Sequence, residues 1–128
     1  MAEKSGWWGK VLHRLTAADD ELEAEDLRRA AAAEGAAPIV GCQDHQEACV
    51  AGTIRSVTLR TRSGAPSLEV EIYDGSGSAT LVFLGRRQIP GLDAGRSLKA
   101  SGRISRDERR TTIFNPRYEL LPASSAGV

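Results

Sequence analysis

The second half of the chain alternates between apolar and polar residues with a period of two. In residues 67–74, SLEVEIYD, every second residue is apolar, and this predicts a strand with one buried and one exposed face. Four further stretches rich in aliphatic and β-branched residues predict strands over residues 48–60, 78–85, 96–105 and 111–121. Asn115-Pro116 interrupts the last of them, because proline has no N–H to give to a sheet. The pattern therefore predicts a mainly β protein of five strands.

Turn residues separate these strands. They lie at residues 62–66, 74–77, 86–95 and 106–110, and the glycines of D-G-S-G at 74–77 predict a tight hairpin. A long first strand, a hairpin of the second and third, and a short non-strand insert before the fourth are typical of the OB-fold, a five-stranded Greek-key barrel. Gly52 and Gly102 lie where strands are expected to bend to close the barrel. An SH3-like or open meander barrel is the alternative.

Residues before the barrel have a helical pattern. In residues 6–16, Trp8, Val11, Leu12 and Leu15 fall on one helical face. Residues 20–33 are strong helix formers with acidic residues early, and Gly35 is suited to the position just after the helix. We expect a helical extension over residues 1–37, the barrel over 38–122, and a disordered tail over 123–128.

Charge is divided unequally between these parts. The net charge of the 128 residues is zero, but residues 1–49 sum to −5 and residues 50–128 to +5. A basic module joined to an acidic segment suggests an anionic partner for the barrel, although an acidic helix could serve solubility alone. No apolar run approaches the roughly 18–20 residues of a membrane span. The first ten residues do not resemble a secretory signal, and we expect a cytoplasmic protein.

Several segments of the predicted barrel resemble one family of proteins. VAGTIRSVTLR (50–60), LEVEIYDGSG (68–77), LVFLGRRQIPGL (81–92), GRSLKASGRI (95–104) and IFNPRYELL (113–121) are similar to the actinobacterial OB-fold nucleic-acid-binding proteins. The alternation and the D-G-S-G turn more distantly resemble the OB domains of aminoacyl-tRNA synthetases and of the RecG helicase. The resemblance covers residues 48–121 and implies nucleic-acid binding, although OB barrels also bind sugars and proteins.

OB barrels hold single strands with a basic groove and aromatic rings on which bases stack. Eleven of the twelve cations in residues 50–128 are arginines, whose planar group pairs with phosphate and stacks on bases. The candidate contacts are Arg55, Arg60, Arg62, Arg86, Arg87, Arg103, Arg106, Arg109, Arg110 and Arg117. Among the aromatic candidates Tyr73, Phe83, Phe114 and Tyr118, alternation predicts that Tyr73 points outward, whereas Phe83 could point either way.

Two acidic residues complicate this interpretation. Glu69 and Glu71 share the outward face of the second strand with Tyr73, and carboxylates there would repel phosphate. Binding would then centre on the first strand and the arginine turns. Alternatively, the carboxylates pair with arginines of neighbouring strands and the face binds nothing.

Other reactive residues form no recognisable site. Cys42, His45 and Cys49 could ligate zinc with Asp44 or His13, but the spacing fits no common motif, and reduced thiols are the simpler expectation. No nucleophile–base pattern or paired-acid motif is present in the sequence. We therefore expect a protein without enzymatic activity, metal or cofactor.

These observations favour a protein that binds single-stranded DNA or RNA and does not act on membranes. The alternative is a protein-interaction adaptor, in which the barrel is a scaffold and the N-terminal helices bind the partner through Trp7-Trp8 or the acidic residues 19–26. In a third arrangement the acidic segment folds over the arginines, imitates nucleic acid and inhibits binding.

Overall fold

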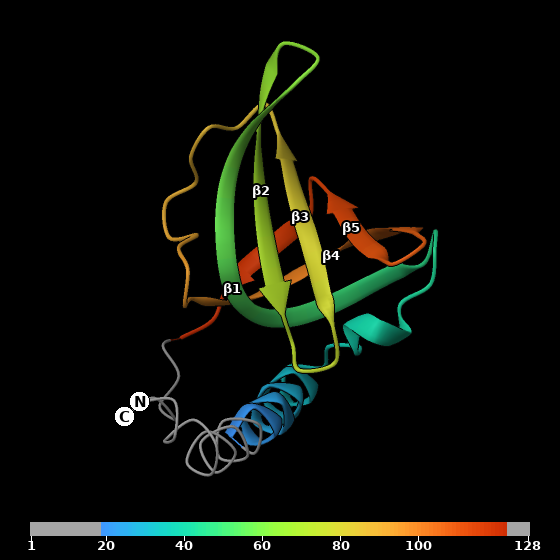
Figure 1. Cartoon of the computed structure of the whole chain (residues 1–128). Helices are drawn as coiled ribbons and strands as arrows, with labels where there is room; N and C mark the ends of the chain where they lie inside the picture. The colour runs from blue at the N-terminus through green and yellow to red at the C-terminus, as the bar shows by residue number, and fades with distance from the viewer. Residues whose placement is uncertain (1–18, 123–128) are drawn as a thin grey trace, which may run out of the picture.

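The computed structural model describes residues 19–122, and its strands close into a barrel (Figure 1). The strands are β1 (Glu47–Arg62), β2 (Ala65–Tyr73), β3 (Ser78–Leu84), β4 (Ser97–Asp107), β5 (Arg110–Phe114) and β6 (Arg117–Leu120). They are ordered β1-β2-β3-β5-β4-β6, and β1 also pairs with β4, which closes a ring of five strands. All pairs are antiparallel except β3–β5, which is parallel. This is the connectivity of the predicted barrel.

Two of the predicted turns are shorter than expected. The loop predicted at residues 62–66 is only Ser63-Gly64, because β1 and β2 stay paired as far as Arg62 and Ala65. Likewise the turn predicted at 106–110 is only Glu108-Arg109, since β4 and β5 pair up to Asp107 and Arg110. Charged residues at a strand end look like a turn in the sequence, but they can continue a ladder when their side chains reach solvent.

The predicted interruption of the last strand is confirmed. β5 ends at Phe114. β6 begins at Arg117 and pairs with residues 98–101 near the start of β4. Asn115 has φ of 49° and its N–H donates to the carbonyl oxygen of Val82 at 2.7 Å. The change of direction at Asn115-Pro116 therefore separates β5, which pairs with β3 and the end of β4, from β6, which pairs with the start of β4.

Gly52 allows the long first strand to curve around the barrel. A Cβ built on Gly52 would lie 2.7 Å from the carbonyl oxygen of Tyr73, a separation that backbone atoms do not permit. Gly102 of β4 similarly faces a side-chain carbon of Ile113 at 2.8 Å. Both glycines therefore lie at close approaches between strands, where no side chain fits.

The inner faces of the strands form one apolar core. It includes Leu68, Val70 and Ile72 of β2 and Leu98, Ala100 and Ile104 of β4, as alternation predicts. Ile39 of the short 3-10 helix η1 (Ile39–Gly41) and Ile89 and Leu92 of the β3–β4 loop belong to the same cluster. These two irregular segments cover apolar groups that the strands alone would leave exposed.

Asp74 fastens η1 to the β2–β3 turn. Its carboxylate is 1% exposed and accepts hydrogen bonds from the backbone N–H of Ile39, Ser76 and Gly77 at 2.8–3.0 Å, and from the hydroxyl of Ser76 at 2.7 Å. A buried carboxylate needs such donors, because it loses its hydration on folding. The D-G-S-G segment is therefore a turn, as predicted, and also an anchor for the chain that enters the barrel.

The helix that covers residues 19–33 lies across the end of the barrel next to the β2–β3 turn (Figure 1). Ala31 is buried, and Gly75 approaches the carbonyl oxygen of Ala24 so closely that a side chain at position 75 would overlap it. Gly35 follows the helix with φ of 75°, as expected of the residue after a helix. Within residues 19–122, none of the helices has the length and apolarity that crossing a membrane requires.

Two predictions lie outside the described residues. They are the helix over residues 6–16 with its Trp7-Trp8 face, and the tail over 123–128.

Candidate nucleic-acid interface

Three arginines from two strands converge on the carboxylate of Glu69. Arg60 Nε donates to Glu69 Oε1 at 3.2 Å, and Arg62 Nη2 donates to Oε2 at 3.0 Å. Arg110 Nη2, which follows 41 residues later in the sequence, donates to Oε1 at 3.4 Å. We call Arg60, Arg62, Glu69, Arg110 and the neighbouring Phe114 the Glu69 cluster.

Strand register brings these residues together. Glu69 of β2 lies opposite Thr58 of β1 and Val82 of β3, and Val82 lies opposite Phe114 of β5. Residues two apart on a strand share a face, so Arg60 and Arg62 lie on the same outer face as Thr58, and Arg110 shares it with Phe114. The cluster therefore crosses the outer face of β1, β2, β3 and β5, between the β1–β2 and β4–β5 turns.

The charges of the cluster do not cancel. One carboxylate faces three guanidiniums, which leaves an excess of two positive charges. The Glu69 side chain is only 7% exposed, whereas those of Arg60, Arg62 and Arg110 are 59%, 44% and 61% exposed. The carboxylate is therefore shielded beneath cations that still reach the solvent, and the repulsion of phosphate expected from Glu69 is offset.

The ionisation of Glu69 follows from this arrangement. Burial from water raises the pKa of the carboxyl, but the hydrogen bond from Arg62 and the positive charges of Arg60, Arg62 and Arg110 outweigh it. The pKa of Glu69 is lowered as a result, and the carboxylate is ionised at neutral pH.

Phe114 adds an aromatic surface to the cluster. Its side chain belongs to the exposed large apolar groups of the molecule, at 45% exposure. The guanidinium carbon of Arg62 lies 5.7 Å from the centre of its ring. An aromatic ring beside an arginine is a combination found on surfaces that bind single strands.

Three further predicted arginines lie near the two turns that flank the cluster. Arg86 and Arg87 are exposed and follow Gly85, whose N–H donates to the carbonyl oxygen of Pro66 beside the β1–β2 turn. Arg109 is exposed in the β4–β5 turn next to Arg110. Arg109 is therefore next to a member of the cluster, and Arg86 and Arg87 follow a residue that contacts β2 near the β1–β2 turn.

Tyr73 lies at the other end of the same face. It is half-buried and stacks against Arg55, whose guanidinium carbon is 3.8 Å from the ring centre. Tyr73 lies four positions after Glu69 on β2, about 13 Å at the rise of a strand. The predicted outward direction of Tyr73 is correct, but one face of its ring is already occupied by Arg55.

Phe83, whose direction alternation left open, points inward, so as a candidate for an exposed stacking ring it is wrong. Its side chain is 5% exposed and belongs to the core, because it shares the inner face of β3 with Leu81. Its ring meets that of Tyr118 edge to face, with 5.6 Å between centres. Tyr118 of β6 remains 40% exposed.

The remaining arginine candidates are not part of the cluster. Arg106 donates to the carbonyl oxygens of Val40 and Cys42 at 3.3 and 3.0 Å, so it holds η1 against β4. Arg103 contacts Nδ1 of His45 at 3.1 Å, and Arg117 is exposed on β6. Of these three arginines, Arg117 alone has no described side-chain contact.

Neither cysteine belongs to the Glu69 cluster. Cys42 is buried and its thiol points to the carbonyl oxygen of Pro38 at 3.5 Å, while Cys49 lies on β1, and both thiols are free. Burial and the charge of Asp74 raise the pKa of the Cys42 thiol against the opposing effect of Arg106. In residues 19–122 no three His, Cys, Asp or Glu side chains are arranged to hold a metal ion.

Sequence reasoning treated Glu69 mainly as an obstacle to phosphate, and gave its pairing with arginines of neighbouring strands as the alternative. That pairing is confirmed for Glu69, but which arginines meet there was not identified. A signal was available in the alternation, because Arg60 and Arg62 share one face of β1 and the hairpin turn places that face beside the glutamates of β2. Arg110 had no such signal, since the parallel pairing of β3 with β5 is not visible in the sequence.

A closed five-stranded barrel with this strand order has the architecture of the OB-fold. Comparison with protein families agrees, since residues 48–121, more than half of the chain, match the tRNA_anti-codon family, described as an OB-fold nucleic acid binding domain. The chain belongs to this family. A search of curated proteins found no match.

Proposed function

We propose that this protein binds single-stranded DNA or RNA, without enzymatic activity, on the outer face of β1, β2, β3 and β5. The observation that carries the proposal is the Glu69 cluster, in which three exposed guanidiniums meet beside an exposed phenylalanine ring. We assign phosphate binding to Arg60, Arg62 and Arg110 and base stacking to Phe114. Arg86, Arg87 and Arg109 would extend the track of phosphates at its two ends.

The position of the cluster on the fold supports this assignment. In OB-fold barrels the face of the second and third strands, with the loops after the first and fourth strands, binds oligonucleotides and oligosaccharides. The Glu69 cluster crosses that face, and its arginines come from β1 beside the β1–β2 turn and from β5 beside the β4–β5 turn. The excess of positive charge favours a polyanion over a neutral sugar.

The cluster is organised before the ligand arrives. Glu69 holds three guanidiniums within 3.4 Å of its own oxygens, so they lie close together in spite of their mutual repulsion. A guanidinium has five N–H donors, and each arginine of the cluster uses one toward Glu69, which leaves the others for phosphate oxygens. Less side-chain freedom is lost on binding when the donors are already in place.

Unpaired bases fit this surface better than a duplex. Phe114 offers a ring face, and bases stack on such a ring only when they are free of their complement. The cations lie on a curved barrel face rather than on a helix or ribbon shaped for a groove of duplex DNA.

We also propose that the protein is cytoplasmic and that, within the OB-fold proteins, it resembles the actinobacterial nucleic-acid-binding ones.

The described acidic helix does not cover this surface. It lies at the end of the barrel opposite the β1–β2 turn (Figure 1), and within residues 19–122 its ion pairs are internal, from Arg29 to Glu25 and Asp26. Glu34, which follows the helix, pairs with Lys99 at 3.8 Å. The hypothesis that the acidic segment folds over the arginines and inhibits binding therefore gains no support from residues 19–34.

The proposal is tested by fluorescence anisotropy with labelled single-stranded and duplex oligonucleotides over a range of salt. Arg62→Ala should weaken single-strand binding about tenfold, since hydrogen bonds to charged groups contribute roughly 1.5 kcal/mol at the low end. It should also reduce the slope of log K against log salt by about 0.7, the value for one phosphate on a single strand.

Arg29→Ala is the matched control, because it removes the same charge from an exposed helical arginine far from the cluster. It should leave affinity and slope at their wild-type values. Equal effects of the two substitutions would assign binding to net charge rather than to the cluster. Absence of single-strand binding by the wild-type protein at low salt would reject the function itself.

A further inference from the structure

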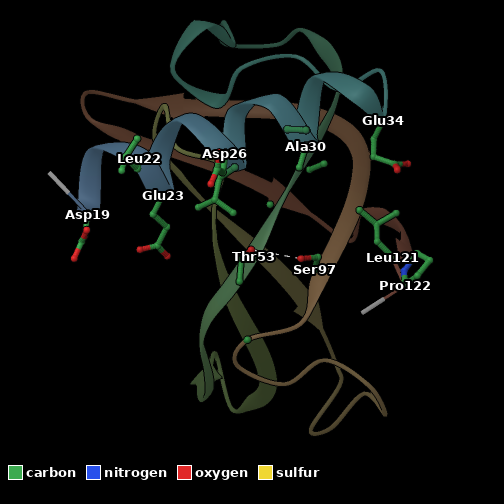
Figure 2. A pocket seen from close by; sticks show the side chains of 15 residues that line it. Asp19, Leu22, Glu23, Asp26, Ala30, Glu34, Thr53, Ser97, Leu121 and Pro122 are labelled. Atoms are coloured by element: carbon green, nitrogen blue, oxygen red, sulfur yellow. Dashed lines mark hydrogen bonds between the residues drawn. The ribbon is translucent and has the colours of Figure 1, made fainter. Parts of the chain in front are cut away.

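A groove runs between the helix and the barrel at the end opposite the Glu69 cluster. It has a volume of about 550 Å³ and lies beneath residues 19–34, above Thr53 of β1 and Ser97 of β4 (Figure 2). Its size falls within the roughly 300–1,000 Å³ of pockets that hold a ligand. Thr53 and Ser97 contact each other through their hydroxyls at 3.4 Å, so few polar groups of the floor are free.

The groove combines apolar and acidic residues. Its apolar lining consists of Leu22, Leu27, Ala30, Ala31, Ala51, Leu121 and Pro122. Four acidic residues also line it, namely Asp19, Glu23, Asp26 and Glu34, with no lysine or arginine among the described lining residues. Leu22 is 59% exposed, a large apolar surface to leave in water on a helix. The chemistry of the groove therefore suits a segment with an apolar face and basic residues.

Residues 1–18 have that chemistry. Their apolar residues at helical spacing are Trp8, Val11, Leu12 and Leu15, preceded by Trp7. They carry Lys4, Lys10 and Arg14 against a single acidic residue, Glu3, which gives a net charge of +2. Residues 19–49 sum to −7 by comparison, and the basic segment is joined directly to a residue that lines the groove, Asp19.

The length of this segment matches the groove. From Asp19 to Glu34 the helix side of the groove extends over 15 residues, about 22 Å at the rise of a helix. Residues 6–16, predicted as a helix, would extend about 16 Å, and residues 17–18 remain for the connection. Two antiparallel helices joined by about two to five residues are a common arrangement.

We propose that residues 7–15 of the same chain fold back into this groove, with Trp7 or Trp8 among its apolar residues and Lys10 and Arg14 beside its acidic ones. The groove is then an intramolecular docking site that fastens the start of the chain to the barrel. The Trp7-Trp8 face is consequently occupied rather than offered to a partner protein. The proposal does not depend on nucleic-acid binding.

Tryptophan fluorescence tests the proposal directly, because Trp7 and Trp8 are the only tryptophans in the protein. In the full-length wild type, docking predicts emission at shorter wavelength than free tryptophan and poor quenching by acrylamide. Ala30→Lys places a cation and added bulk in the groove at an exposed position. The substitution should lower the ratio of docked to free segment about tenfold. This change corresponds to roughly 1.4 kcal/mol of docking free energy, which lies within the usual cost of overpacking.

Ala32→Lys is the matched control, because it makes the same change at an exposed residue on the other face of the same helix, outside the groove. It should leave emission and quenching unchanged, and circular dichroism should be the same for both variants. Tryptophans that are already exposed in the wild type, or equal responses of the two variants, would overturn the proposal.

Dilution separates this arrangement from exchange between two copies. Intramolecular docking predicts an emission spectrum that is independent of protein concentration. Emission that shifts to longer wavelength on dilution, together with a dimer in light scattering, would place the segment in a second copy and contradict the proposal. Oligonucleotide affinity should be the same for Ala30→Lys and wild type, so failure here and failure of nucleic-acid binding are distinguishable.

Discussion

Replacing Glu69 with glutamine separates the two roles that the structure gives to this residue. The substitution keeps the shape of the side chain and one acceptor oxygen, but it removes the charge that three arginines share. The local excess of positive charge then rises from two to three. We expect Glu69→Gln to destabilise the fold and to tighten binding of single strands at low salt.

The expected loss of stability follows from the exposure of the partners. All three arginines are more than a third exposed, so each pair contributes only about 0.2–1 kcal/mol. Because glutamine still accepts one hydrogen bond, the free energy of unfolding should fall by about 1–2 kcal/mol at pH 7. For a domain of this size, Tm should fall by about 5–10 °C.

The pH dependence has a definite sign. The pKa of Glu69 is lowered in the folded protein, so its stabilisation is complete above the pKa of an unfolded glutamate, about 4.3, and is lost as pH falls through the folded value. The wild type should therefore be more stable than Glu69→Gln at neutral pH, and the difference should shrink below about pH 4. Urea unfolding at pH 7 and pH 3 measures this difference.

The effect on binding is measured across salt. If the released guanidiniums contact one more phosphate, the slope of log K against log salt steepens by about 0.7. The ratio of the variant's binding constant to that of the wild type then falls about 2.6-fold between 50 and 200 mM salt, as that slope implies. Glu25→Gln on the helix serves as the control for net charge, and Glu71→Gln, which is exposed on the same face, serves as the control for stability.

Two results would refute this reasoning. A folded Glu69→Gln variant with wild-type affinity and slope would mean that phosphate does not contact the cluster. A folded variant that binds more weakly would mean that holding the guanidiniums in place outweighs the charge that the carboxylate brings.

Two further substitutions test stacking and barrel closure. Phe114→Ala should weaken single-strand binding by about 1–3 kcal/mol with an unchanged salt slope; an equal loss in Leu84→Ala, an exposed apolar control on β3, would argue against stacking. Gly52→Ala should destabilise the protein by more than about 2 kcal/mol, because its Cβ would lie 2.7 Å from the Tyr73 carbonyl oxygen. A melting temperature equal to wild type would show that β1 can shift there without cost.

Much of the fold could be predicted from local pattern. Alternation identified the inner faces of β2 and β4, and the interruption at Asn115-Pro116 was correctly placed. These features depend on neighbours along one strand. When the residues of one face of a strand are charged, alternation is sufficient to show that the other face is buried. Phe83 shows the limit of the method, because β3 has apolar residues on both faces and alternation cannot then choose the buried one.

The site depended on contacts that the sequence does not contain. The sequence alone determined a basic, arginine-rich β module after an acidic segment, because composition and period are local properties. The tertiary structure decided that Arg60, Arg62 and Arg110 meet at Glu69, because this requires both the β1–β2 register and the parallel pairing of β3 with β5. Charge along a chain is additive, but what a charge does depends on which other charges the fold places within a few ångströms of it.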